Sequence, residues 1–335
     1  MKNVSIIIPC FNEEGTISKT LSGIIGQSYP TAMMEVIIAD GLSTDGTRTK
    51  ISEFQHLHPE LQIFVMDNPK RTIPAGLNLA IQTATGETII RLDAHSIPAL
   101  DYIEKCVTAL EANKGDNVGG VWDIQPVNQG WVAKSIAKAA ASKLGVGDAN
   151  YRLKTGSGPV DTVPFGAFRK ATLDRLGGYD ESLLTNEDYE LNTRIRKQGG
   201  IVWLDSSIQC TYFARATFSD LGRQYWRYGF WKAQMLKRYP GTIRWRQALP
   251  PAFVLGLIGS LFLSIFQPAF LFIFSTVISI YMLVLLAHAL NIALKNRFPA
   301  FIIGIPIAIF IMHILWGSGM VAGVLSNPKP KNLLH

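Results

Sequence analysis

Thr88-Ile-Ile-Arg-Leu-Asp-Ala-His-Ser96 is the stretch that decides the fold. Its first five residues are mostly apolar and β-prone, which predicts a buried strand over 88–92. Asp93 and His95 stand directly after that strand. A strand that delivers a carboxylate and an imidazole together is suited to hold a divalent cation, and a cation at such a place often bridges phosphates. The stretch therefore indicates nucleotide-linked chemistry at the end of a strand.

Strands and helices alternate on both sides of this stretch, from Val4 to about Asp220. This alternation is typical of an α/β domain with a largely parallel sheet. Besides 88–92, we expect strands at 4–8, 36–39 and 62–66, and helices near 17–25, 74–81, 102–110 and 187–195. Residues 128–160 show no clear period, and we interpret them as a mobile insert.

Three long stretches without an acidic or basic residue follow the α/β region. They are Pro251–Phe266, Pro268–Leu290 and Ala300–Leu325. The last two exceed the length needed to span a bilayer, and the first is marginal. The alternative, three buried helices of a soluble protein, is disfavoured by their length and lack of charge. Basic residues lie before the first stretch and between the second and third, so the positive-inside rule predicts three spans with the tail 327–335 outside.

Charge is segregated along the chain. All 25 acidic residues lie at or before Asp220, together with 21 Lys and Arg, whereas the remainder has 11 basic residues and no acid. The basic overall balance therefore does not indicate a nucleic-acid-binding protein. Three distant cysteines argue against a disulfide framework and fit a reducing compartment. No signal peptide precedes the first strand, so we expect the first domain to stay in the cytoplasm.

The segment 221–239 interleaves aromatic and basic residues. That composition is typical of a helix that lies in the membrane interface, where it would dock the first domain against anionic lipid. We therefore divide the chain into an α/β domain at 1–220, a basic aromatic region at 221–248, a membrane domain at 249–326 and a tail at 327–335.

Acidic residues stand where a ligand would lie in an open α/β sheet, beyond the carboxyl ends of strands. Asp40 ends the second strand and could accept from a nucleobase or a ribose, although a turn-capping role before a glycine is the plain alternative. Glu187 and Asp188 open a helix, where acids are favoured electrostatically and where a general base could also stand. The loop 164–169 contains Gly166, which allows a substrate to approach closely.

Taken in order, these motifs resemble the family 2 inverting glycosyltransferases of the GT-A fold. Val4–Glu14 resembles the family's opening strand and loop, and Asp40–Thr47 its nucleotide-binding turn. Asp93-Ala-His95 stands in the place of the DxD metal motif and Glu187-Asp188 in that of the ED motif. Gln224–Tyr228 resembles the QxxRW motif. The resemblance covers about 3–230 and is greatest to the succinoglycan-type members, which extend a lipid-linked oligosaccharide.

The resemblance implies a mixed, mainly parallel GT-A sheet followed by transmembrane helices in a cytoplasmic membrane, with the catalytic domain facing the cytoplasm. Its implied partners are a UDP-sugar donor, such as a UDP-hexose, a lipid-linked saccharide acceptor and membrane lipid, but no nucleic acid. Asp188 would be the catalytic base, and Asp93 with His95 would hold Mg²⁺ or Mn²⁺. The residues implied to bind the donor are Pro9, Asn12, Glu14, Asp40, Asp93 and Arg227. Those implied to lie on the acceptor side are Glu187, Gly166, Gln224 and Tyr228.

Two departures from the family pattern bear on function. His95 replaces the second Asp of the metal motif, and Tyr228 replaces the Trp of QxxRW. With only three candidate spans, the second departure favours single-sugar addition over a processive polysaccharide synthase. A polyprenyl-phosphate sugar transferase and a membrane scaffold with a degenerate transferase domain are further alternatives. A dehydrogenase is excluded because no GxGxxG follows the first strand.

Overall fold

The computed structural model describes residues 3–154 and 156–326. The chain forms two compact units, each with its own set of elements. The first unit takes residues up to 123 together with 150–212, and the second takes 124–149 together with the residues from 213 onward. The predicted α/β domain at 1–220 is thus not the same set of residues as the first unit, because 124–149 groups with the C-terminal helices. The predicted tail at 327–335 lies outside the described residues.

A mixed sheet forms the centre of the first unit, with the strand order β3-β2-β1-β4-β8-β6-β9-β5 and β7 paired to β9. Its strands are β1 Val4–Cys10, β2 Met34–Asp40, β3 Gln62–Asp67, β4 Thr88–Arg91, β5 Ser96–Pro98, β6 Asn117–Pro126, β7 Gly158–Pro159, β8 Ala167–Arg169 and β9 Val202–Ala214. β1 pairs in parallel with β2 and β4, and β2 pairs in parallel with β3. β4 pairs with β8 in antiparallel fashion. The expected mixed sheet is confirmed: β3, β2, β1 and β4 pair in parallel, and β8 runs antiparallel between β4 and β6.

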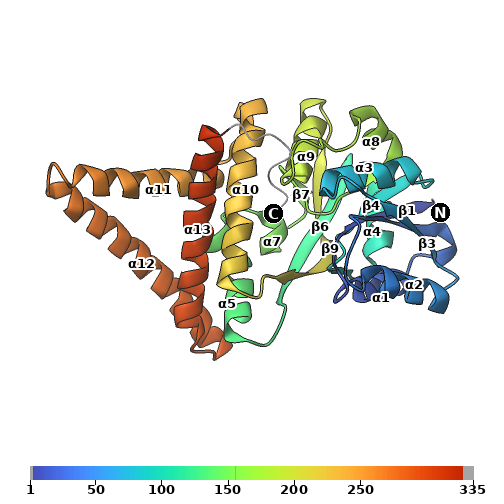
Figure 1. Cartoon of the computed structure of the whole chain (residues 1–335), viewed down its shortest axis with the longest axis horizontal. Helices are drawn as coiled ribbons and strands as arrows, with labels where there is room; N and C mark the ends of the chain where they lie inside the picture. The colour runs from blue at the N-terminus through green and yellow to red at the C-terminus, as the bar shows by residue number, and fades with distance from the viewer. Residues whose placement is uncertain (1–2, 155, 327–335) are drawn as a thin grey trace. The chain divides into compact units, whose positions relative to one another are not determined.

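β1, β2 and β4 are mostly apolar and buried because both faces of the sheet are covered there, whereas β3 at the edge of the sheet leaves Phe64 and Val65 exposed. Figure 1 shows α3, α8 and α9 on one face and α1, α2 and α4 on the other. These helices are α1 Ile17–Ile25, α2 Thr47–Leu57, α3 Ile73–Thr83, α4 Tyr102–Glu111, α8 Lys170–Leu176 and α9 Glu187–Lys197. Two short elements, η1 Thr31–Met33 and α7 Asn150–Leu153, complete this unit. The helices expected from apolar spacing are all present.

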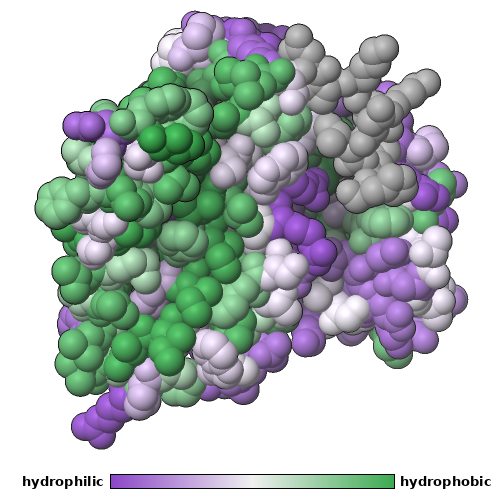
Figure 2. Space-filling view, turned by 60° about the vertical axis from the view of Figure 1, so that its left-hand side comes forward, coloured by the Kyte–Doolittle hydropathy of each residue, from purple (hydrophilic) through white to green (hydrophobic). Residues whose placement is uncertain are grey.

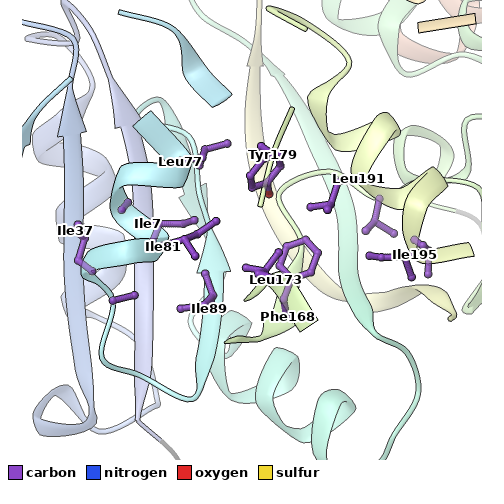
Figure 3. Close-up of a cluster of buried hydrophobic side chains, with 14 of the residues drawn as sticks. Ile7, Ile37, Leu77, Ile81, Ile89, Phe168, Leu173, Tyr179, Leu191 and Ile195 are labelled. Atoms are coloured by element: carbon purple, nitrogen blue, oxygen red, sulfur yellow. The ribbon is translucent and has the colours of Figure 1, made fainter. Parts of the chain in front are cut away.

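The core on the α3 side joins the parallel strands to the later helices (Figure 3). Ile7 and Ile37 of the sheet pack with Leu77 of α3 and with Leu191 of α9. This packing fixes the start of α9 relative to the end of β4, which brings the two acidic motifs of the sequence to one place. The strand order reverses between β1 and β4, and ligands bind beside such a switch point in open α/β sheets.

The second unit is helical. Its elements are α5 Trp131–Ala140, α6 Lys143–Val146, α10 Phe218–Arg238, η2 Pro240–Thr242, α11 Trp245–Leu263, α12 Ala269–Asn296 and α13 Phe301–Leu325. Residues 128–160, interpreted as a mobile insert because they show no clear period, contain α5 and α6, which pack against α13. Ala133, Ile136, Ala137 and Ala140 form the buried face of α5. Alanine is only weakly apolar, so the helical spacing of these residues did not predict a buried helix face.

α11, α12 and α13 are each long and apolar enough to cross a membrane. α11 and α12 form a helical hairpin with a short connection around Gln267, and they carry many exposed apolar side chains. Figure 2 shows apolar side chains gathered over the face that is turned forward, where these helices lie. The predicted basic aromatic helix is also present as α10, but its aromatic side chains do not all face outward. Tyr225, Phe230 and Trp231 are buried.

Candidate active site

The site lies at the carboxyl ends of β1, β2 and β4, where three loops meet. Asn12, in the loop after β1, has a left-handed backbone with φ 54°. Its backbone and its side chain each make a hydrogen bond to the loop after β2. Its backbone N–H donates to Ser43 Oγ at 2.9 Å, and its Oδ1 accepts from Thr44 N at 2.8 Å. Glu14 Oε2 accepts from Gly46 N at 3.1 Å. Asn12 and Glu14 therefore hold the loops after β1 and β2 together, and their predicted part in donor binding stays a prediction.

Asp40 is fully buried at the end of β2. Its carboxylate accepts from the backbone and hydroxyl of Ser43 and from Arg48 Nε at 2.5 Å. Arg48 also donates to Asp67 Oδ1 at 2.5 Å, which links the ends of β2 and β3. These three bonds enclose the carboxylate, so Asp40 fixes the turn at Ser43 and the side chain of Arg48. Pro9, another predicted donor-side residue, lies in β1 opposite Ala39.

Phe11 was quoted in the opening motif but not predicted as a site residue. It is 46% exposed, and the guanidinium of Arg71 lies 5.9 Å from the centre of its ring. A Cβ on Gly41 would lie 3.2 Å from that ring, so the glycine lets the second loop pass close to it. The signal available in the sequence was an aromatic residue directly after a buried strand, where ligands bind in open α/β sheets.

Arg91 is the residue that organises the site, and sequence reasoning missed it. It ends β4, its side chain is 4% exposed, and it contacts three carboxylates. Arg91 Nη2 lies 3.1 Å from Asp93 Oδ1 and 3.1 Å from Glu187 Oε1, while Nη1 donates to Asp188 Oδ1. The available signal was a charged residue inside a buried strand, because such a charge needs partners. Those partners lie up to 97 positions away, so the sequence did not identify them.

α9 carries the predicted ED motif at its first turn. Asn186 precedes it with a left-handed backbone, φ 68°, in which the chain turns into the helix. Glu187 is buried, whereas the Asp188 side chain is 28% exposed. Partial burial raises the pKa of Asp188 to about 7, with Arg91 opposing the shift and Glu187 and Asp93 adding to it. A carboxyl group with such a pKa can exchange a proton near neutral pH.

Asp93 and His95 are the predicted metal ligands. His95 Nδ1 lies 2.9 Å from Glu13 Oε1, and Glu13 Oε2 accepts from the Thr16 hydroxyl. Because an ionised carboxylate only accepts, Nδ1 carries a proton, and in the neutral imidazole the lone pair is then on Nε2. A carboxylate behind a histidine orients metal-binding imidazoles in this way. Glu13 was not predicted as a site residue.

Within residues 3–154 and 156–326, no three His, Cys, Asp or Glu side chains converge as a metal cluster. A cation held partly by substrate phosphates needs only one or two protein ligands. One carboxylate from Asp93 and one imidazole from His95 fit that mode, and imidazole suits Mn²⁺ better than Mg²⁺.

The remaining predicted residues divide between the two units. Gly166 has φ 56°, and its carbonyl accepts from Arg91 N at 3.0 Å, so it serves the β4–β8 pairing. Gln224, Arg227 and Tyr228 lie on α10 in the second unit. Gln224 Nε2 donates to Tyr228 Oη at 2.9 Å, and Arg227 is exposed. Their parts in donor or acceptor binding stay predictions.

Comparison with known proteins adds to this geometry. The sequence profile described as "Glycosyl transferase family 2" matches residues 5–177. The chain is 30% identical over 316 residues to the succinoglycan biosynthesis protein ExoA of Rhizobium meliloti, covering 94% of this chain and 92% of that protein. It is 28% identical over 331 residues to a Methanococcus voltae protein, covering 97% of this chain and 98% of the other. That protein is named dolichyl N-acetyl-alpha-D-glucosaminyl phosphate 3-beta-D-2,3-diacetamido-2,3-dideoxy-beta-D-glucuronosyltransferase.

Among solved structures, the fold is similar to that of the mannosyltransferase PcManGT from Pyrobaculum calidifontis, which was determined with GDP-Man and Mn²⁺. The TM-score is 0.62 at 20% identity, with 93% of this chain and 86% of that chain covered. The likeness shows a shared GT-A architecture. Together with the matched profile and the relatives, it leads to one conclusion: the chain belongs to glycosyl transferase family 2.

Proposed function

We propose that this protein is an inverting glycosyltransferase that moves a sugar from a UDP-sugar to a lipid-linked saccharide. The single observation that carries the proposal is the Arg91 guanidinium, which holds Asp93 and Asp188 beside one another. A base next to the anchor of a diphosphate is what direct displacement at an anomeric carbon requires. The lipid-linked acceptor is supported by the Methanococcus voltae relative, whose name describes a dolichyl-phosphate-linked sugar acceptor.

Asp188 would take the proton from an acceptor hydroxyl while that oxygen bonds to the anomeric carbon of the donor. The bond from this carbon to the diphosphate oxygen breaks in the same step, and the nucleoside diphosphate leaves with the electron pair. One displacement inverts the anomeric centre, so an α-linked donor gives a β-glycoside. Arg91 keeps Asp188 turned toward the site throughout.

On the donor side, Phe11 presents an exposed ring on which a nucleobase could stack. Asp40 is enclosed by Ser43 and Arg48, so it would bind a base N–H only after exchanging one of these partners. A divalent cation bound at Asp93 and His95 would supply positive charge to the leaving diphosphate. The structure of PcManGT, which has a similar fold, was determined with Mn²⁺ bound. A hexose such as glucose is the donor sugar that we propose to test first.

The proposed function is tested by a transfer assay with the purified full chain in detergent and Mn²⁺. UDP-hexoses are offered with either a polyprenyl-diphosphate-linked saccharide or a polyprenyl phosphate as acceptor. We expect UDP release together with a β-linked product on the saccharide acceptor, assigned by NMR of the new anomeric proton. A product on lipid phosphate alone, or retention of the anomeric configuration, would contradict the proposal.

The metal site is tested by direct binding, without turnover. We expect His95→Ala to weaken Mn²⁺ binding in the presence of UDP more than Glu13→Gln does. Glu13 acts on the cation only through the imidazole, and loss of such a partner costs about 10–100-fold in metal affinity. Mn²⁺ titrations followed by electron paramagnetic resonance give both values. Unchanged affinity in His95→Ala would remove this residue from the ligand set.

A further inference from the structure

α13 is as apolar as a membrane-spanning helix, yet its surroundings differ from those of α12. In its most apolar 18-residue window, 44% of the residues are buried, against 6% for α12. The first half of α13 packs on α5 and α6: a Cβ on Gly304 would lie 2.1 Å from Ser135 Oγ, and one on Gly145 of α6 would lie 3.1 Å from Met312. α13 is therefore covered by protein where a lipid-facing helix would be exposed.

The second half of α13 packs in parallel on α10, with the two backbones in direct contact. The residue numbers rise together along both helices. Successive contacts pair Gly222 with Leu315, Trp226 with Gly319, Phe230 with Gly323 and Lys237 with Ser326. A Cβ on Gly319 would lie only 2.2 Å from the Trp226 carbonyl oxygen. Gln234 Nε2 adds a hydrogen bond of 2.6 Å to the Gly323 carbonyl. Figure 1 shows the two helices side by side within this unit.

α10 cannot enter the hydrocarbon core. It carries six charged residues, namely Asp220, Arg223, Arg227, Lys232, Lys237 and Arg238. Arg223 pairs with Asp220 and is 74% exposed. Charged side chains at the centre of a bilayer are costly and rare, and exposed ones have no protein cavity to shelter them.

If α13 crossed the membrane, these contacts would carry α10 into the bilayer with it. Leu315 lies near the middle of α13, so a crossing helix would place Gly222 and the adjacent Arg223 close to the bilayer centre. The chain enters α10 only three residues after β9 ends at Ala214. Four peptide steps reach at most about 14 Å, less than the roughly 15 Å half-thickness of the hydrocarbon core. The start of α10 is therefore held on the side of the catalytic sheet.

The α11–α12 hairpin has the opposite character. From Pro268 to Leu290 there is no charged residue, and the tip exposes Ile265 by 75% and Phe266 by 72%. Basic residues stand at both ends of the hairpin, with Arg244 and Arg246 at the start of α11 and Lys295 and Arg297 at the end of α12. The positive-inside rule places both ends on one side of the membrane.

We propose that only the α11–α12 hairpin enters the lipid core and that α13 lies in the interface, between this hairpin and the layer of α5, α6 and α10. The helix then begins and ends on one side of the bilayer. Ser326, the last residue that the structure describes, is then on the catalytic side, and two crossings replace the predicted three. The proposal does not depend on which sugar the enzyme transfers.

Sidedness tests the proposal on the full chain in bacterial cells. Green fluorescent protein and alkaline phosphatase are each fused after His335, because the first fluoresces only inside the cell and the second is active only when exported. We expect a fluorescent first fusion and an inactive second one. An active phosphatase fusion with a dark fluorescent protein would overturn the proposal and restore the third crossing.

Cysteine labelling gives a second readout that does not rely on a fused protein. Leu325→Cys marks the end of α13, where the native side chain is 82% exposed, and Asn296→Cys marks the end of α12. The three native cysteines are buried, so the unsubstituted chain is the background control. A membrane-impermeant maleimide should label both variants only after permeabilisation. Labelling of Leu325→Cys in intact cells, with Asn296→Cys protected, would contradict the proposal.

Discussion

At the scale of single residues, the site depends on one buried cation and three acids. Arg91 is enclosed by Asp93, Glu187 and Asp188, and the ring of Tyr179 lies 6.0 Å from its guanidinium. Removing one partner of a buried ion pair leaves the other charge unpaired, which destabilises the protein more than replacing both partners by apolar residues. The geometry makes Arg91 a positioning residue for the proposed reaction, since it acts through the acids.

We expect Arg91→Met to lower kcat about 100-fold or more, because the base loses its anchor. Arg91→Lys should recover part of this loss. Arg194→Met is the matched control, since Arg194 makes a buried pair with Glu190 on the same helix at 2.7 Å. Both methionine variants should lower Tm, but Arg194→Met should keep kcat within a few-fold. Equal kcat for the two methionine variants would show that Arg91 is only structural.

The pH dependence of kcat reports on Asp188 directly. A base must be unprotonated to act, and its pKa is about 7, so kcat should fall as the pH drops below this value. The Arg91 charge lowers the pKa of Asp188, so Arg91→Met should move the acidic limb to higher pH, while Arg194→Met should leave it in place. An acidic limb near pH 4 in the wild type would rule out this assignment.

At the scale of elements, the sequence predicts the four parallel strands well, because each contains a short run of β-prone apolar residues. It also places the acids correctly at the start of α9, because an apolar period follows them. α5 was missed since its buried face is mainly alanine. The Arg91 contacts were missed because they depend on how α9 packs on the sheet, which no local pattern encodes. The loop contacts of Asn12 and Glu14 are likewise long-range.

The α10–α13 contact should be sensitive to added volume. Gly319→Leu would force a side chain against the Trp226 carbonyl, and overpacking costs about 1–3 kcal/mol. The matched control is Gly256→Leu on α11, where a Cβ meets nothing within 4 Å. In detergent we expect a lower Tm for Gly319→Leu and an unchanged Tm for Gly256→Leu. Equal Tm values would mean that the close helix contact is not formed.

At the scale of the whole molecule, charge and apolarity separate the two compact units. All acidic residues stand at or before Asp220, so every carboxylate of the proposed chemistry belongs to the sheet unit or its loops. The helical unit provides the three long apolar helices and a large share of the basic residues. This division fits a reaction in which a water-soluble nucleotide-sugar meets an acceptor that is held in lipid.

The most direct test of the central claim uses Asp188→Asn in the full chain, with donor binding and transfer measured side by side. Asparagine keeps the size of the side chain but cannot accept the proton. We predict that transfer falls about 100- to 10,000-fold, while the Kd for the UDP-sugar with Mn²⁺ changes by less than about two-fold. Transfer at the wild-type rate, or loss of donor binding together with transfer, would contradict Asp188 as the base of a sugar transferase.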